Sequence, residues 1–294
     1  MTVIKCGKAM PLSAESIRSL HPYDIRVLLS LEHLMKRYQW VPLDDLAGDA
    51  GLSAAETRYR LGRLMARGMV RFEKVPYDGY TLIFGGYNAL ALHAASERGA
   101  VQALGEFVGE GKESVVYRGL GLTEVALKFH RVGQRSFQSA RIKRGYLPPE
   151  GHIPWIFASA HSAKREYEAL TLLHPRVPVP LPLLRNRNLV VMGWVEGATL
   201  NRCAVEEPGA VLEEILGHVA AAYRIGVIHG DLSEFNIMTD GERLVLIDWP
   251  QWVEPSHPNA EEVLRKDLEN LLAHFARRYG LEYPVGEAMA EVTG

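Results

Sequence analysis

The sequence contains very little cysteine, since only Cys6 and Cys203 occur among its 294 residues. These two cysteines lie far apart and lack the close spacing of metal ligands. The sequence therefore argues against a disulfide-stabilised scaffold and against a zinc site. A chain of this composition suits a reducing compartment, and we expect a cytoplasmic protein.

Long apolar segments and strong net charge are also missing. No continuous apolar run approaches the roughly 18 residues of a membrane span, and the start MTVIKCGKAM lacks the apolar centre of a signal peptide. We therefore expect no membrane partner. The formal net charge is only −2, so any surface that binds nucleic acid must be local.

The chain does have enough apolar material for two folded domains, with 47% hydrophobic and 23% charged residues. Helical patterns and one hairpin dominate up to residue 84, and strands rich in glycine follow residue 105. The stretch between them is rich in small residues and predicts a helix and a connector. We predict an α+β protein with domains over residues 1–90 and 91–294.

The first domain shows three helical patterns. Residues 24–38 have apolar side chains at helical spacing, and a short second helix should end in a turn at Gly51. A third helix should begin after Ser53, because Glu56 three residues later completes the pattern of a capping box. Gly68 is well placed to end this helix in the left-handed conformation.

A hairpin follows the three helices. The segment VRFEKVPYDGYTLIF predicts two strands joined at Asp78-Gly79, which together with the helices indicates a winged helix-turn-helix. In such a domain the last helix commonly enters the DNA major groove. The arginines that we expect to face nucleic acid here are Arg58, Arg60, Arg63 and Arg67. Ordinary solvated charges, or a surface for protein docking, stay open as alternatives.

A loop containing glycines opens the second domain. Residues 107–131, FVGEGKESVVYRGLGLTEVALKFHR, predict two strands around Gly109 and Gly111 and then a third strand. Glycines let the backbone approach phosphates closely, as in protein kinases, although Ser114 stands where a third glycine is expected. The segment Val125-Ala126-Leu127-Lys128 nearly repeats the kinase VAIK strand. Lys128 is therefore expected to contact the α- and β-phosphates of ATP.

An acidic partner for Lys128 is expected on the next helix, SAKREYEALTLLH, for which Ser162 is a candidate N-cap. We prefer Glu166 as this partner. Glu168, about half a turn away around the helix, is the alternative.

The segment LVVMGWVEG, residues 189–197, fits the strand and hinge that bind adenine in kinases. Met192 would be the gatekeeper, and the backbone of Gly193 and Val195 would bond to the base. This hinge divides the second domain into an N-lobe over about residues 91–192 and a C-lobe over about residues 193–294.

Two nearby segments contain the expected phosphoryl-transfer residues. In HGDLSEFNIM, Asp231 would accept a hydroxyl proton or orient the nucleophile. Asn236, together with Asp248 of LVLIDWPQ, would hold Mg²⁺. A hairpin turn at Asp240-Gly241 should bring Asn236 and Asp248 together. As isolated residues, Asp231 and Asp248 could be a turn residue and a helix cap, but that explanation leaves their shared kinase spacing unexplained.

Several signatures of ordinary protein kinases are missing. The chain has HGD instead of HRD, Asp248-Trp249-Pro250 instead of DFG, and no APE segment. Small-molecule kinases of the aminoglycoside and choline type also use HGD and often IDW. Those enzymes usually have His-Pro-Gly before the Asn, whereas this chain has Ser233-Glu234-Phe235.

At this point the sequence resembles the RIO family of atypical serine protein kinases, in the branch with an N-terminal winged helix, RIO kinase 2. The matching pieces are GEGKESVVY, LKFHRVGQRSF, HGDLSEFNIM and IDWPQWVEPSHPNAEEVLRKDLENLL, and they cover nearly the whole chain with its domain order. Trp249 replaces the Phe expected after the metal-binding Asp, which concerns local packing. The resemblance implies a bilobal kinase fold. Because the chain ends soon after the kinase half, without a long regulatory tail, we expect a prokaryotic, archaeal source.

The same resemblance implies specific ligands and partners. It adds Lys112 and Ser114 to the ATP contacts and makes Mg²⁺ the metal, for which Mn²⁺ could substitute. It makes Asp248 a transient phosphoryl acceptor, so that the enzyme would work mainly as an ATPase. Its flexible loop would be self-phosphorylated at Ser136 or Ser139. The implied partners are the precursor of the small ribosomal subunit and its rRNA.

The last predicted helix, residues 259–279, has an Asn cap and should close the C-lobe, with Asp267 anchoring the catalytic loop. Two other hypotheses remain beside a RIO-type enzyme. One is a small-molecule kinase with a regulatory domain that binds nucleic acid. The other is a non-enzymatic nucleic-acid-binding protein whose kinase half only senses ATP.

Overall fold

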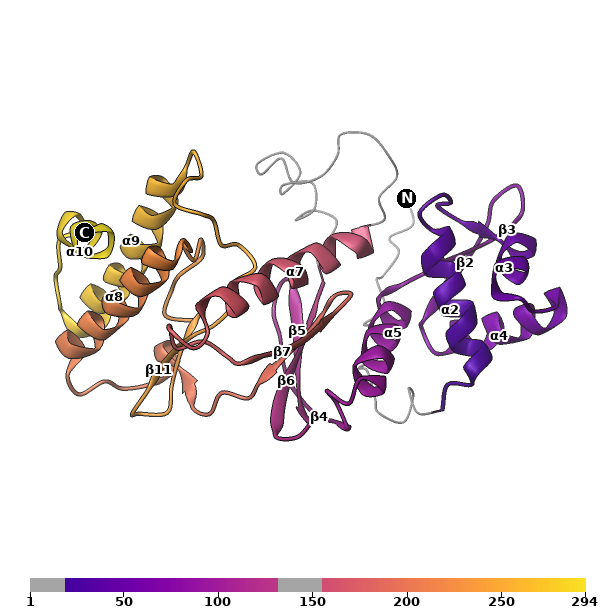
Figure 1. Ribbon diagram of the computed structural model, residues 1–294, viewed down its shortest axis with the longest axis horizontal. Helices are drawn as coiled ribbons and strands as arrows, with labels where there is room; N and C mark the ends of the chain where they lie inside the picture. The colour runs from indigo at the N-terminus through magenta and orange to yellow at the C-terminus, as the bar shows by residue number, and fades with distance from the viewer. Residues whose placement is uncertain (1–18, 132–154) are drawn as a thin grey trace. The chain divides into compact units, whose positions relative to one another are not determined.

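The structure is a computed structural model, and it describes residues 19–131 and 155–294 (Figure 1). Within these residues the chain forms two compact units. The first contains residues 19–123, 127–131, 155–161 and Arg185–Leu189, and the second contains Glu124–Ala126, Ser162–Leu184 and Val190–Gly294. Helices and strands contribute to both units, which confirms the predicted α+β class.

Three helices begin the first unit, as predicted: α2 (Pro22–Leu34), α3 (Leu43–Ala50) and α4 (Ala54–Ala66). At the start of α2 the His21 side chain accepts from the amide of Tyr23, and Asp24 accepts from the amide of His21, so two free amides of the first turn are bonded. Gly51 ends α3 at a φ of 60°, which confirms the predicted turn.

The start of α4 forms only half of the predicted capping box. The amide of Glu56 donates to the Ser53 hydroxyl at 3.2 Å, as expected. The Glu56 carboxylate, however, does not reach back to Ser53, because it accepts from the Arg60 guanidinium at 2.6 Å. A charged partner one turn ahead is a stronger donor than a backbone amide. Gly68 has a φ of 66° after the helix end, as predicted.

The predicted hairpin exists, but its turn lies elsewhere. Strands β2 (Val70–Lys74) and β3 (Asp78–Leu82) pair antiparallel with Lys74 opposite Asp78, so residues 75–77 form the turn and Asp78-Gly79 belong to β3. A Cβ on Gly79 would lie 2.7 Å from the Cβ of Trp40, next to β1 (Val41–Pro42), which pairs with β3. Gly79 therefore permits close packing beside β1.

One apolar core joins the winged helix to the helix that follows it, α5 (Phe84–Glu97). Side chains of this cluster include Leu28, Leu31, Leu61, Leu64, Tyr80, Leu82, Tyr87 and Leu90. Each fully buried leucine of this kind contributes about 1.5–3 kcal/mol. Because α5 runs through residue 90 without a break, the predicted domain boundary near residue 90 falls inside a continuous helix.

The strands of the kinase-like half form a five-stranded sheet in the order β4-β5-β6-β8-β7. The strands are β4 (Ala103–Glu110), β5 (Ser114–Leu120), β6 (Glu124–His130), β8 (Leu189–Gly193) and β7 (Pro182–Asn186). The three strands expected around the glycine loop and the strand expected at residue 189 are confirmed. Within the first unit, β4 and β5 form an antiparallel pair with two register shifts.

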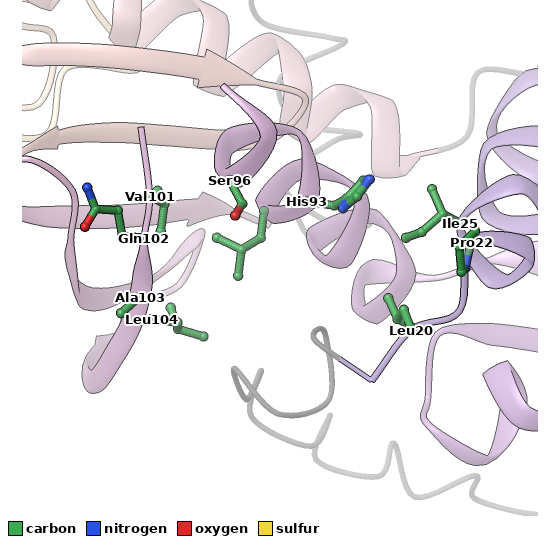
Figure 2. Close-up of a pocket in the computed structure, with 10 residues that line it drawn as sticks. Leu20, Pro22, Ile25, His93, Ser96, Val101, Gln102, Ala103 and Leu104 are labelled. Atoms are coloured by element: carbon green, nitrogen blue, oxygen red, sulfur yellow. The ribbon is translucent and has the colours of Figure 1, made fainter. Parts of the chain in front are cut away.

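A cavity of about 380 Å³ lies in the first unit between the start of α2, the end of α5 and the start of β4 (Figure 2). Its lining is mainly apolar, with His93, Ser96 and Gln102 as polar members. The lining residues Gln102–Leu104 lie at the start of β4, whereas Gly109 lies near its other end. The cavity is therefore separate from the glycine loop.

The second unit is mainly helical, with α8 (Pro208–Ile225), α9 (Ala260–Tyr279) and α10 (Val285–Thr293). Asn259 precedes α9 as predicted, but its side chain forms no cap hydrogen bond. Residues 259–279 were expected to be the last helix, and this was wrong, because α10 follows. Its Ala288 and Val292 are buried in the same apolar core as α8 and α9.

The helix α7 (Trp155–Leu173) begins seven residues earlier than predicted. Ser162 therefore lies inside the helix and is not its N-cap. The cause is that residues before Ser162, such as Ile156, are buried in the core of the first unit, so tertiary packing extends the helix. Over the described part of the chain, no helix is both long and apolar enough to cross a membrane.

Candidate active site

The glycine loop between β4 and β5 is a tight turn. The amide of Gly111 donates to the carbonyl of Ser114 at 2.8 Å, and Lys112 at the tip is exposed. A Cβ on Gly109 would meet nothing within 4 Å, and neither Gly109 nor Gly111 has a left-handed φ. Neither packing nor backbone conformation in the described chain requires these glycines, so they leave room for a ligand above the loop.

Lys128 lies in β6 and is only 7% exposed. Its strand neighbours Leu127 and Phe129 are completely buried, and they point to the opposite face of the sheet from Lys128. A buried cation is stable only beside anionic groups. This position suits a lysine that compensates the charge of phosphates or of a carboxylate.

The two candidate acids on α7 lie in different environments within the second unit. Glu166 is 1% exposed. Glu168 is 42% exposed at its side chain and is paired with Lys164 at 3.5 Å across one helical turn. Burial makes Glu166 the acid with the greater need for a cationic partner.

The expected hinge begins at the end of β8, where Met192 is buried. The amide of Gly193 already donates to the carbonyl of Leu181 at 2.8 Å, so this amide is not available to bond with a base. No such bond occupies the amide of Val195 among the residues that the structure describes. Of the two expected hinge amides, that of Val195 is therefore the one left as a donor to a base.

A short hairpin brings the two expected metal ligands together. Strands β10 (Ile237–Thr239) and β11 (Leu244–Leu246) pair with Ile237 opposite Leu246, and the amide of Ile247 donates to the carbonyl of Asn236 at 2.9 Å. Asn236 and Asp248 are thus neighbours at the open end of the hairpin, as predicted from the turn at Asp240-Gly241. A third strand, β9 (Ala198–Thr199), pairs with β10 and supports it.

The donor set at this hairpin fits Mg²⁺. The Asn236 Nδ2 donates to the carbonyl of Asp231 at 2.8 Å, which fixes the amide and leaves its Oδ1 as a ligand atom. With the Asp248 carboxylate this gives hard oxygen donors, which Mg²⁺ prefers. Asp248 has a φ of 67°, a left-handed conformation that costs a residue with a Cβ about 1–2 kcal/mol. Strain of this kind concentrates at functional sites.

Asp267 of α9 anchors the catalytic loop, as predicted. Its two carboxylate oxygens accept from the amides of Gly230 at 2.7 Å and Leu232 at 2.9 Å, on either side of Asp231. Burial raises the pKa of Asp267 to about 6, although the two amide bonds oppose this shift. The exposed carboxylate of Asp231 is therefore presented from a rigid loop.

The structure explains why HGD has a glycine, Gly230, where ordinary protein kinases have the arginine of HRD. Gly230 has a φ of 81°, and a Cβ there would lie 2.5 Å from the carbonyl oxygen of Gln251. The arginine of HRD could not occupy this position without moving the backbone of residue 251. The segment after Asp248 therefore packs directly under the catalytic loop.

Sequence reasoning gave no role to His229. Its Nε2 lies 3.0 Å from the carbonyl of Ile247, its Nδ1 accepts from the amide of Asp231, and its ring lies 4.3 Å from that of Trp249. Trp249 is 1% exposed and donates to the carbonyl of Leu246. The contact between His229 and Trp249 therefore joins the loop of Asp231 to the loop of Asp248. Both residues belong to recognisable motifs, HGD and IDW, but only the fold shows that their rings are in contact.

The four arginines expected to face nucleic acid do not share one environment. Arg58 is exposed at 63% of its side chain, and Arg63 and Arg67 are partly exposed. The prediction for Arg60 was wrong, because this side chain is 8% exposed, bonds to Glu56 and pairs with the buried Asp24 at 3.6 Å. Arg60 therefore links α4 to α2 through this ion pair.

The serines expected in a phosphorylated loop, Ser136 and Ser139, lie outside the described residues.

Comparison with known proteins gives consistent matches over most of the chain. Residues 17–98 match the family model described as Rio2, N-terminal, and residues 110–287 match the model of the RIO domain. The RIO-type serine/threonine-protein kinase Rio2 of Methanocaldococcus jannaschii is 40% identical over 252 residues, which cover 83% of this chain and 92% of the relative.

Eukaryotic relatives give the same result. The serine/threonine-protein kinase RIO2 of Caenorhabditis elegans is 38% identical over 277 residues, or 92% of this chain, and the chain spans about half of that relative, 52%. The crystal structure of the Rio2 kinase-ADP/Mg²⁺-phosphoaspartate complex from Chaetomium thermophilum matches with a TM-score of 0.81 and 29% identity. The match covers 95% of this chain and 89% of the Chaetomium thermophilum chain.

Proposed function

Because this chain belongs to the RIO family of serine/threonine protein kinases, in its Rio2 branch, we propose that it uses ATP and Mg²⁺ to phosphorylate itself and to drive a step in maturation of the small ribosomal subunit. The observation that supports phosphoryl transfer most directly is the joint placement of Asp231, Asn236 and Asp248 by one hairpin and one anchored loop.

Each residue has a distinct task in this proposal. Gly109 and Gly111 admit the phosphates, and Lys128 compensates their charge. Asn236 and Asp248 hold Mg²⁺, which neutralises charge on the departing phosphoryl group. Asp231 orients the acceptor and takes its proton when the acceptor is a serine hydroxyl.

Asp248 is also the proposed acceptor of a transient phosphoryl group. The solved structure of the Rio2 kinase from Chaetomium thermophilum is a complex with ADP, Mg²⁺ and a phosphoaspartate. In this chain an Asp248 oxygen would form a bond to the γ-phosphorus while the bond to the ADP oxygen breaks. Water would then hydrolyse the acyl phosphate and return the carboxylate and inorganic phosphate. Net turnover would be ATP hydrolysis.

The partner proposed here is the precursor of the small ribosomal subunit, met in the cytoplasm. The exposed Arg58 and the partly exposed Arg63 and Arg67 on α4 would contact its rRNA phosphates. This is a local basic surface on a chain of net charge −2, so binding should depend on these few side chains.

Labelling with γ-labelled ATP and Mg²⁺ tests the proposal. Wild type should become labelled and release phosphate, and Asp231→Ala and Asp248→Asn should lose both. Label that hydroxylamine removes is an acyl phosphate, whereas label that survives is a phosphoserine. Wild type should co-sediment with small ribosomal subunits. Failure of wild type to turn over ATP, or efficient phosphorylation of an aminoglycoside or choline, would refute the proposal.

A further inference from the structure

Ser233-Glu234-Phe235 separates this chain from small-molecule kinases, and these residues form a tight turn between Asp231 and Asn236. The amide of Asn236 donates to the carbonyl of Ser233 at 2.9 Å, so Glu234 and Phe235 are the two corner residues. Their side chains differ sharply in exposure. The Glu234 side chain is 12% exposed, whereas Phe235 is 57% exposed.

The Glu234 carboxylate is held by α9. Its Oε1 lies 3.4 Å from Nδ1 of His274 and 3.6 Å from the guanidinium of Arg277. The backbone carbonyl of Glu234 accepts from the amide of Asn201 at 3.3 Å. A carboxylate withdrawn from water is stable only where such partners compensate it, so these contacts define where the corner of the turn lies.

The contacts belong to one continuous face of α9. Asp267, Asn270, His274 and Arg277 follow at intervals of three and four residues, which places them above one another on a helix. Asp267 holds the amides of Gly230 and Leu232, and Asn270 Nδ2 donates to the carbonyl of Leu232 at 3.4 Å. His274 and Arg277 then hold Glu234. Helix α9 therefore contacts the catalytic loop both before its Asp231–Leu232 segment, at Gly230, and after it, at Glu234.

We propose that Glu234 is a positioning residue for the metal ligand Asn236, acting through His274 and Arg277 of α9. The inference rests on the proposed use of ATP and Mg²⁺. Asn236 is two residues from Glu234 in the same closed turn, and its amide must keep the orientation set by the carbonyl of Asp231 for its Oδ1 to reach the metal. Loss of the Glu234 contacts would release the corner of this turn.

The test compares Glu234→Ala and Glu234→Gln with the control Glu269→Ala, which removes an exposed acid of α9. Mn²⁺ affinity in the presence of ADP is measured by electron paramagnetic resonance, and ADP affinity is measured in EDTA by calorimetry. Glu234→Ala should weaken Mn²⁺ binding about tenfold or more, as loss of groups that orient a metal ligand does. Its ADP affinity in EDTA should stay within about twofold of wild type, because the metal ligand is not used there.

The other outcomes are equally specific. Mn²⁺ binding by Glu234→Gln should be within about threefold of wild type, because the glutamine keeps an oxygen acceptor where Oε1 of Glu234 lies 3.4 Å from Nδ1 of His274. Mn²⁺ affinity of Glu234→Ala within twofold of wild type would overturn the inference, as would an equal loss of ADP affinity in EDTA. If Glu234→Ala does not fold, Arg277→Met, at a side chain that is 68% exposed, should weaken Mn²⁺ binding about threefold, and no change there would also overturn it. Wild type without metal-dependent ADP binding would instead refute the proposed function.

Discussion

Replacing Gly230 with alanine tests whether the backbone of the catalytic loop requires glycine. The left-handed φ of 81° costs a residue with a Cβ about 1–2 kcal/mol. The new Cβ would lie 2.5 Å from the carbonyl oxygen of Gln251, and relieving such a contact in a packed site costs about 1–3 kcal/mol more. We expect the free energy of unfolding to fall by about 3 kcal/mol. ATP turnover should fall by about a hundredfold, because Asp231 moves with the loop.

A matched control is available in α8. Gly217 lies inside this helix, and a Cβ there would meet nothing within 4 Å. The same substitution, Gly217→Ala, should therefore stabilise the protein by about 0.5–1 kcal/mol. Urea unfolding followed by circular dichroism gives both stabilities, and phosphate release gives turnover. A Gly230→Ala protein with wild-type stability and turnover within twofold would refute this account of the HGD sequence.

The remaining predictions concern the buried Asp267 and two arginines of α4. Because burial raises the pKa of Asp267 from its ordinary 3.8 to about 6, the folded protein holds this proton more tightly than the unfolded chain does. The contribution of Asp267 to the unfolding free energy should fall by on the order of 3 kcal/mol as the pH rises from about 4 to above 6. Asp267→Asn should lack this dependence, and urea unfolding across that range would show whether the slope persists. Arg60→Met should destabilise the protein by on the order of 3 kcal/mol, since it leaves the carboxylate of Asp24 buried without its cation. Arg58→Met should leave the free energy of unfolding within about 0.5 kcal/mol of wild type. It should reduce the slope of RNA affinity against salt concentration by the amount that corresponds to about one phosphate contact. Equal effects of the two substitutions on stability would contradict the structural difference between these arginines.

Sequence patterns predicted the parts of the site that depend on neighbours along the chain. Asp231, Asn236 and Asp248 are joined by a short loop and one hairpin, so their spacing alone required that Asn236 and Asp248 meet. The helices of the first unit and the strands around Gly109 and Gly111 were predicted for the same reason, because hydrophobic periodicity and turn residues are local signals.

Only the tertiary structure decided which charged side chains are buried and what each one contacts. Arg58 and Arg60 are two residues apart on one helix, yet one faces solvent and the other pairs with Asp24 of another helix. Glu234 meets His274 forty positions later, and Gly230 must be glycine because Gln251 passes beneath it. The sequence by itself determined the family and the chemical groups of the site. The environment of each group was decided by the fold, because burial and pairing depend on residues that are distant in the chain.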